Sequence, residues 1–186
     1  MRVISGTARG RHLKELQGME TRPTTDRVKE ALFNIVQFEL PGRQVLDLFA
    51  GTGQLGIEAL SRGAARCTFV DQRRDAAALV RENVKLTGLS QQAQVVQADS
   101  ISFLMSCREK FDVIFLDPPY LTGVLEKAVE TVSAFDILRE HGIMVCESPL
   151  EQELPTLAAP YERGKEYRYG KIKLTVYRHL GGEDRR

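Results

Sequence analysis

The chain has 186 residues, of which 42% are hydrophobic and 27% charged, the composition of a soluble globular protein with one core of ordinary size. No apolar stretch approaches the about 20 residues that a membrane helix needs, and no signal peptide opens the chain. Three scattered cysteines and three scattered histidines argue against a disulfide framework and a metal site, so we expect a cytoplasmic protein without metal or membrane contacts.

The first 41 residues are predicted to form a basic extension and one helix. Residues 1–22 look extended and irregular. A helix is expected to begin near Thr25 and Asp26, because Thr is a favoured N-cap and an acid stabilises the first turn. Pro41-Gly42 ends this helix, whose apolar face is formed by Val28, Ala31, Leu32, Ile35 and Val36.

From residue 42 onward, apolar segments alternate with amphipathic ones. Strands are predicted at 44–49, 67–71, 94–98, 111–116 and 143–147, and helices at 54–62, 74–87, 100–106 and 125–138. This alternation is typical of a doubly wound α/β fold with a parallel sheet. Residues 165–169 and 171–178 alternate polar and apolar side chains around Gly170, which predicts an antiparallel hairpin at the sheet edge. We expect one globular unit, with the 1–41 extension preceding a 42–186 domain.

The net charge of +1 conceals an uneven distribution. Residues 1–29 hold seven Lys or Arg against three Asp or Glu, and residues 162–179 hold six against two, so each segment carries +4. Residues 30–161 hold eleven against eighteen, which gives −7. A polyanionic partner explains two basic ends, and simple solvation of exposed strands and tails explains them equally well. If the partner is a nucleic acid, the residues expected to bind it are Arg2, Arg9, Arg11, Lys14 and Arg22.

A glycine-rich turn follows the first predicted strand, in the segment Asp47-Leu-Phe-Ala-Gly51-Thr-Gly53-Gln-Leu-Gly56. The glycines allow a tight turn and a close approach of the backbone to a nucleotide-like ligand. Because Gly51, Gly53 and Gly56 also satisfy the dinucleotide fingerprint, a nicotinamide-dependent oxidoreductase is one alternative. Against it, Asp47 places a negative charge where a pyrophosphate would lie, and 186 residues leave little room for a second nucleotide-binding half.

Three acids lie at the carboxyl ends of three successive predicted strands. S-adenosylmethionine has an α-amino group that suits Asp47, a ribose that suits Asp71 and an adenine amino group that suits Asp99. Each acid also has a structural explanation, since Asp47 can organise the turn, Asp71 can begin a turn and Asp99 can cap a helix. Their shared position at strand ends favours a cofactor site.

The segment Asp117-Pro118-Pro119-Tyr120 follows the strand predicted at 111–116, where open α/β sheets bind their ligands. An exocyclic amino group of a nucleobase is a poor nucleophile, because its lone pair is delocalised into the ring. Asp117 can accept one N–H of such a group and a carbonyl of the Pro-Pro turn the other, which stabilises the charge that develops during methyl transfer. The prolines stiffen the turn, and Tyr120 offers a face for stacking a base. A strand-ending turn without catalytic function is the alternative.

These motifs, together with Arg22-Pro-Thr-Thr-Asp-Arg-Val-Lys-Glu-Ala-Leu-Phe-Asn34 and Glu58-Ala-Leu-Ser-Arg-Gly63, resemble the bacterial 16S rRNA (guanine-966-N2)-methyltransferase family over nearly the whole chain. The resemblance implies a class I, Rossmann-like α/β fold with a seven-stranded, mostly parallel sheet. It implies S-adenosyl-L-methionine as donor and a guanine of 16S rRNA, in the small subunit or an assembly intermediate, as acceptor. It assigns the catalytic turn to Asp117, Pro118, Pro119 and Tyr120, and the cofactor pocket to Asp47, Gly51, Gly53, Asp71 and Asp99.

Other methyltransferases and one non-enzyme remain alternatives. A DNA adenine-N6 methyltransferase shares the Asp-Pro-Pro-aromatic motif but usually adds a recognition domain, for which no long insertion is present. A cytosine-C5 enzyme needs a nucleophilic cysteine beside the base, whereas Cys67 and Cys146 lie in predicted strands and Cys107 follows a short helix. An inactive RNA-binding subunit would not need intact glycine and Asp-Pro-Pro-Tyr motifs.

Overall fold

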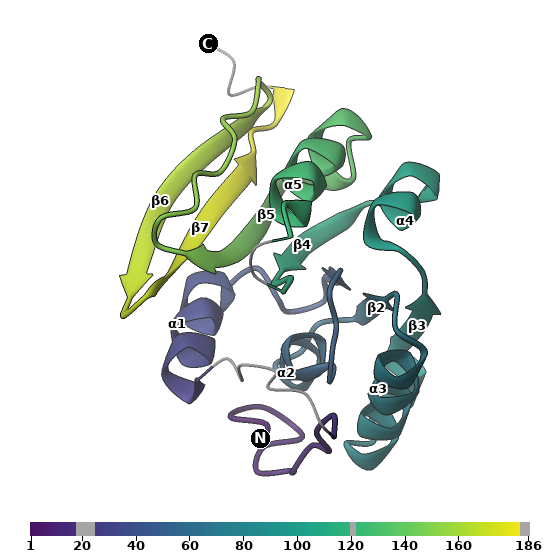
Figure 1. The fold of residues 1–186 in the computed structure, drawn as a ribbon. Helices are drawn as coiled ribbons and strands as arrows, with labels where there is room; N and C mark the ends of the chain where they lie inside the picture. The colour runs from purple at the N-terminus through teal and green to yellow at the C-terminus, as the bar shows by residue number, and fades with distance from the viewer. Residues whose placement is uncertain (18–24, 120–121, 183–186) are drawn as a thin grey trace.

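The computed structural model describes residues 1–17, 25–119 and 122–182. Within these ranges seven strands form one sheet in the order β3-β2-β1-β4-β5-β7-β6 (Figure 1). The first five strands are parallel, whereas β7 runs antiparallel to both β5 and β6. The strands are β1 (Gln44–Asp47), β2 (Arg66–Asp71), β3 (Ala93–Gln97), β4 (Phe111–Leu116), β5 (Leu138–Pro149), β6 (Tyr161–Tyr169) and β7 (Ile172–His179).

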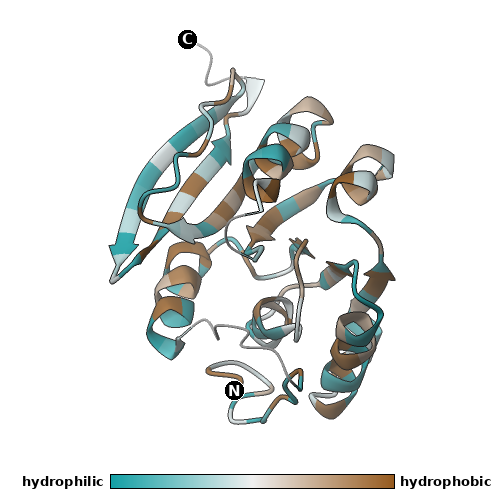
Figure 2. Cartoon of the chain, viewed as in Figure 1, coloured by the Kyte–Doolittle hydropathy of each residue, from teal (hydrophilic) through white to brown (hydrophobic). Residues whose placement is uncertain are grey.

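Helices cover both faces of the sheet, and each face has its own hydrophobic cluster. On one face lie α1 (Asp26–Val36), α2 (Gln54–Ser61) and α3 (Arg74–Leu86), and on the other lie α4 (Ser100–Ser106) and α5 (Val124–Ala134). Central strands are buried from both sides and are therefore mostly apolar. In β4 all six residues are buried, and five of them are apolar. Figure 2 shows β4 and β5 as mainly hydrophobic and the edge strand β6 as mainly hydrophilic.

The helix predicted at 125–138 is too long at its carboxyl end. In the structure α5 ends at Ala134, and Asp136 adopts a positive φ of 51° that turns the chain. The N–H of Phe111 donates to the carbonyl of Ile137 at 3.0 Å, which starts the pairing of β4 with β5. Residues from Leu138 onward therefore belong to a strand of 12 residues, because sheet pairing outweighs the apolar helical periodicity.

The amino-terminal residues 1–17, called the arm below, form a tight loop that folds back on itself. Arg2 and His12 form an antiparallel bridge, and the N–H of Leu13 donates to the carbonyl of Met1 at 3.0 Å. Val3, Ala8 and Leu13 are buried in the same hydrophobic cluster as α1, α2 and α3. The arm is therefore packed on the face that these helices cover.

A buried carboxylate joins the arm, α1 and α2. Glu58 is fully buried and accepts the N–H groups of Ile4 and Ser5, both at 2.9 Å. It also pairs with the buried Lys29 of α1 at 3.1 Å and with Arg62 at 3.0 Å. Four donors thus compensate the loss of hydration, as a buried charge requires.

Within the described ranges, no helix is long and apolar enough to cross a membrane.

Candidate active site

A cavity of about 480 Å³ lies at the carboxyl edge of the sheet. Its walls come from the segments that follow β1, β2, β3 and β4, with a contribution from β5. The cavity brings together seven residues that the sequence placed in the site, namely Asp47, Gly51, Asp71, Asp99, Asp117, Pro118 and Pro119. Tyr120 lies outside the described residues.

Asp47 is the buried acid at the base of the cavity, with 1% of its surface exposed. Burial raises the pKa of its carboxyl group to about 7, and the negative charge of Asp71 contributes to this shift. The N–H of Gly56 donates to Asp47 Oδ2 at 3.0 Å, and this hydrogen bond acts in the opposite direction by lowering the pKa. A cationic ligand group beside Asp47 would stabilise the carboxylate by neutralising its charge.

The three glycines of the turn have different functions in the structure. Gly51 and Gly53 adopt positive φ angles of 57° and 84°, which other residues rarely tolerate. A Cβ atom on Gly51 would meet no protein atom within 4 Å, so this wall of the cavity is left open for a ligand. Gly53 precedes the first residue of α2. A Cβ atom on Gly56 would lie 2.3 Å from the Phe69 ring, so this glycine permits close packing of α2 on β2.

Asp71 and Asp99 line the cavity and also support its loops. Asp71 accepts the N–H of Gly51 on Oδ2 and that of Arg73 on Oδ1, both at 2.9 Å. Asp99 caps α4 by accepting the N–H and hydroxyl of Ser102, each at 3.0 Å, and these bonds lower the pKa of its carboxyl group. A carboxylate has about four acceptor positions, so both acids retain capacity for a ligand.

The turn after β4 combines an acid with a stiff backbone. Asp117 is half-buried, Pro118 is buried and Pro119 is exposed. The hydroxyl of Thr122 donates to the carbonyl of Pro119 at 3.2 Å, so that carbonyl is already engaged within the turn. The carbonyl of Pro118 is therefore the better candidate for the second acceptor beside Asp117.

The arm forms one wall of the cavity. Met1 and Leu16 line it, and the hydroxyl of Thr52 donates to Met1 Sδ at 3.4 Å. The fully buried Asn83 of α3 ties the arm to the glycine turn. Its Oδ1 accepts the N–H of Lys14 at 2.8 Å, and its Nδ2 donates to the carbonyls of Lys14 at 3.0 Å and Thr52 at 2.8 Å. Arm and glycine turn therefore hold each other in position.

Several cavity residues were missed by the sequence reasoning. Glu147 is buried and lines the cavity from β5, and its signal was available as an acid at the end of a predicted strand. Thr52 and Thr122 lie beside recognised motifs without a pattern of their own. Met1 and Leu16 gave no signal, because only the folding of the arm brings them to the cavity.

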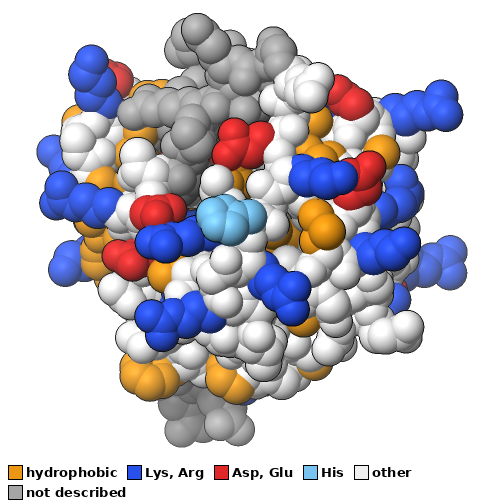
Figure 3. Space-filling view, turned by 90° about the horizontal axis from the view of Figure 1, so that it is seen from below, with side chains coloured by type: hydrophobic (Ala, Val, Ile, Leu, Met, Phe, Trp, Pro, Cys, Tyr) orange, Lys and Arg blue, Asp and Glu red, His pale blue; other side chains and the backbone are white. Residues whose placement is uncertain are grey.

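The described residues that were predicted to bind a nucleic acid are exposed and do not line the cavity: Arg2, Arg9, Arg11 and Lys14. Lys14 Nζ pairs with Glu82 at 3.0 Å. Figure 3 shows the face that carries the arm, where Lys and Arg side chains are spread widely. Arg22 lies outside the described residues.

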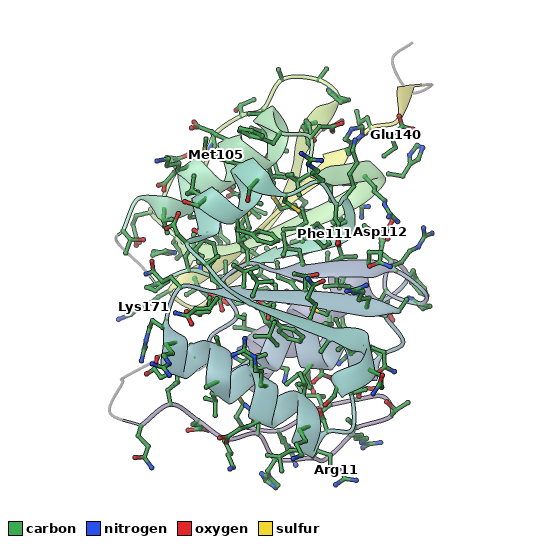
Figure 4. All side chains as sticks on the ribbon, turned by 90° about the vertical axis from the view of Figure 1, so that its right-hand side faces the viewer. Arg11, Met105, Phe111, Asp112, Glu140 and Lys171 are labelled. Carbon is green, nitrogen blue, oxygen red and sulfur yellow. The ribbon has the colours of Figure 1, made fainter. Side chains whose placement is uncertain are left out.

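The bend of the arm lies at the edge of the sheet away from the cavity. The N–H of Thr7 donates to the carbonyl of Ser61, at the carboxyl end of α2, at 2.8 Å. The other end of α2 begins at Gln54 in the cavity wall. Figure 4 shows Arg11 toward the side of Asp112, which lies near the start of β4, and Lys171 of the β6–β7 hairpin on the opposite side. Of the two basic segments, the hairpin tip is therefore on the cavity side.

The sheet order, the antiparallel β7 and a cavity over the carboxyl ends of β1 to β4 define the class I methyltransferase fold, as the sequence predicted. The solved structure of Escherichia coli yhhF has a TM-score of 0.88 and 32% identity, covering 97% of this chain and 98% of that one.

Comparison with known proteins defines the family more closely. Residues 1–178 match the family described as conserved hypothetical protein 95. The Bacillus subtilis protein YlbH is 41% identical over 184 residues, 97% of this chain and 100% of that protein. Ribosomal RNA small subunit methyltransferase D of Escherichia coli K12 is 35% identical over 184 residues, 98% and 92% of the two chains. The chain belongs to the family described as conserved hypothetical protein 95, together with these relatives. This confirms the relationship to bacterial small-subunit rRNA methyltransferases that was expected from its motifs.

Proposed function

We propose that this protein transfers a methyl group from S-adenosylmethionine to the exocyclic N2 amine of a guanine in 16S rRNA. The observation that carries the proposal is the meeting of the Asp117-Pro118-Pro119 turn with Asp47, Asp71 and Asp99 in one cavity. The Escherichia coli relative is named as a small-subunit rRNA methyltransferase, which supports an RNA acceptor. The substrate is the small subunit or an assembly intermediate, in the cytoplasm.

The order of the strands supports the placement of the cofactor. Asp47 and Asp71 are the last residues of β1 and β2, and Asp99 follows β3; these three strands are neighbours in the sheet, about 4.8 Å apart. Their carboxylates thus form a row in which Asp99 would accept a hydrogen bond from the adenine amino group, Asp71 would bind the ribose and Asp47 would pair with the α-ammonium group. When bound, the cofactor supplies an electrophilic methyl group. β4 lies on the other side of β1 from β2, so Asp117 is next to Asp47, the acid proposed to bind the amino acid end of the cofactor.

The catalytic turn then positions the acceptor amine. Asp117 and the carbonyl of Pro118 accept its two N–H groups, so the nitrogen lone pair is free to point toward the methyl group. Both acceptors also stabilise the positive charge that develops on nitrogen, and they are already oriented by the proline backbone. Guanine N2 is buried in a paired stem, so the target base lies in a loop or is flipped at a cost of a few kcal/mol.

Nucleoside mass spectrometry on a deletion strain tests the proposed product. We expect N2-methylguanosine to disappear from one position of 16S rRNA, while N6-methyladenine in genomic DNA stays unchanged. A complementary assay with purified protein should transfer tritiated methyl groups to small-subunit rRNA from the deletion strain. Loss of DNA N6-methyladenine with intact rRNA methylation would assign the chain to the DNA methyltransferases instead.

The arm is proposed to contribute to RNA binding through Arg9 and Arg11. Replacing both by Ala should weaken rRNA binding and lower the slope of log K against log salt by up to about one unit per lost phosphate contact. Cofactor affinity should not change, because neither residue lines the cavity. The matched comparison replaces Arg168 and Lys171, which are exposed on the hairpin at the cavity side. A wild-type slope for the arm variant, with a lower slope for the hairpin variant, would restrict RNA binding to the hairpin side.

A further inference from the structure

Glu147 stands beside the catalytic turn on the neighbouring strand. Leu116 and Cys146 are Cα partners in the parallel pair β4–β5, so the residues that follow them, Asp117 and Glu147, lie side by side. Adjacent strands are about 4.8 Å apart. Both residues line the cavity, and Glu147 is only 6% exposed. The strand register thus places a second carboxylate next to the acid that is proposed to hold the acceptor amine.

The two carboxylates also share one face of the sheet. Phe115 and Val145 precede them by two residues on their strands, and both belong to the hydrophobic cluster beneath α1, α2 and α3. Side chains two residues apart on a strand point to the same face. Two neighbouring carboxylates repel each other, so a group that places several N–H donors between them is favoured there.

The Watson–Crick edge of guanine carries such donors on adjacent atoms, N1–H and the N2 amino group. Adenine and 2-aminopurine have an acceptor lone pair at N1 instead. We propose that Glu147 is the residue that selects guanine, by accepting N1–H while Asp117 accepts from the N2 amine. This inference rests on the proposed function and supplies what the Asp-Pro-Pro turn lacks, because that turn binds an amino group without distinguishing the base that bears it.

The energetic reason for selectivity is the pairing of a charged acceptor with a donor inside a cavity. A buried carboxylate gains a charge-assisted hydrogen bond from N1–H, whereas it faces the lone pair of an N1 acceptor with like polarity. Sites built to hydrogen-bond one group reject analogues that lack it far more strongly than apolar pockets reject a change of size. Glu147 therefore acts on base choice, and Asp117 acts on the 2-amino group that guanine and 2-aminopurine share.

A base-replacement experiment separates these two functions. Small subunits are reconstituted from 16S rRNA that carries either guanine or 2-aminopurine at the target position. 2-Aminopurine keeps the 2-amino group of guanine and lacks N1–H. For the wild-type protein, we expect kcat/KM to be at least about tenfold higher with guanine. In Glu147→Gln the amide Nε2 can donate to N1 of 2-aminopurine, so this preference should fall by about tenfold or more. The KM for S-adenosylmethionine should stay as in the wild type.

Asp117→Asn is the matched control, because both bases present the same amine to it. This variant should lower kcat/KM for both RNAs by a similar factor and leave the preference for guanine unchanged. Equal use of the two bases by the wild type would overturn the inference, even if Glu147→Gln does not fold. An unchanged preference in a folded Glu147→Gln variant would overturn it as well. Absence of methyl transfer from the wild type to the small subunits that carry guanine would instead contradict the proposed function.

Discussion

Replacement of Asp117 by Ala is expected to lower kcat for methyl transfer by about 10²–10³-fold or more, the usual cost of removing one group that stabilises a transition-state charge. Asp117→Asn should retain a measurable fraction of the activity, because the amide oxygen still accepts an N–H bond without the full charge. Single-turnover transfer of a tritiated methyl group measures both effects. Calorimetry with S-adenosylhomocysteine should show a smaller change in cofactor affinity than in turnover.

Asp112 provides the control for this experiment, since it lies near the amino end of β4 (Figure 4), whereas Asp117 follows the carboxyl end of that strand. It accepts the N–H of Gln44 at 2.8 Å and lies 3.4 Å from Arg139 Nη1. Asp112→Asn should change the free energy of unfolding and leave kcat of the folded protein unchanged. Full activity of Asp117→Ala would remove this residue from the mechanism.

The sheet could be predicted from the sequence because its central strands are buried on both faces. The bounds predicted for β4 agree with the structure at both ends, since the apolar run of residues 113–116 stops at Asp117. Acids at the carboxyl ends of parallel strands meet at one edge of the sheet, so the row of Asp47, Asp71 and Asp99 could be predicted from the order of the strands alone. Glu147 ends the strand predicted at 143–147, so the same argument could have placed it in the predicted site.

The contacts of the arm could not be predicted, because they join residues far apart in the chain without a periodic pattern. Asn83 binds the backbone of Lys14, which is 69 residues away, and that of Thr52, 31 residues away. Such amide contacts depend on the final packing of α3 and leave no trace in local propensity. The same holds for Leu16, whose place in the cavity wall follows from the course of the arm. Gly56 was assigned to a possible nucleotide fingerprint, whereas its neighbours show that it serves helix packing.

Cofactor binding is expected to depend on pH through Asp47. Burial raises the pKa of this carboxyl group to about 7, so it is largely protonated below that pH in the free protein and ionised above it. An α-ammonium group binds the carboxylate form and thereby lowers its pKa. The dissociation constant of S-adenosylhomocysteine, which keeps this ammonium group, should therefore be constant above about pH 7 and rise by up to about tenfold per unit below it. Calorimetry across pH 5.5 to 8.5, in buffers of different ionisation enthalpy, should detect about one proton released at the acidic end.

The same shift sets the sign of the stability effect. The pKa of Asp47 in the folded protein lies above its value of about 3.9 in an unfolded chain, so the fold binds more protons between these two values. The contribution of Asp47 to the free energy of unfolding therefore falls as the pH rises from about 4 to 7 in the free protein. Because S-adenosylhomocysteine binds the ionised form more tightly, it should raise Tm more at pH 8 than at pH 6. Asp47→Asn has no titrating group at position 47, so it should bind S-adenosylhomocysteine weakly, with a dissociation constant that does not depend on pH. Asp112→Asn should keep the wild-type pH dependence. A flat profile in the wild type would mean that Asp47 does not face the ammonium group, and that it serves only to hold the N–H of Gly56.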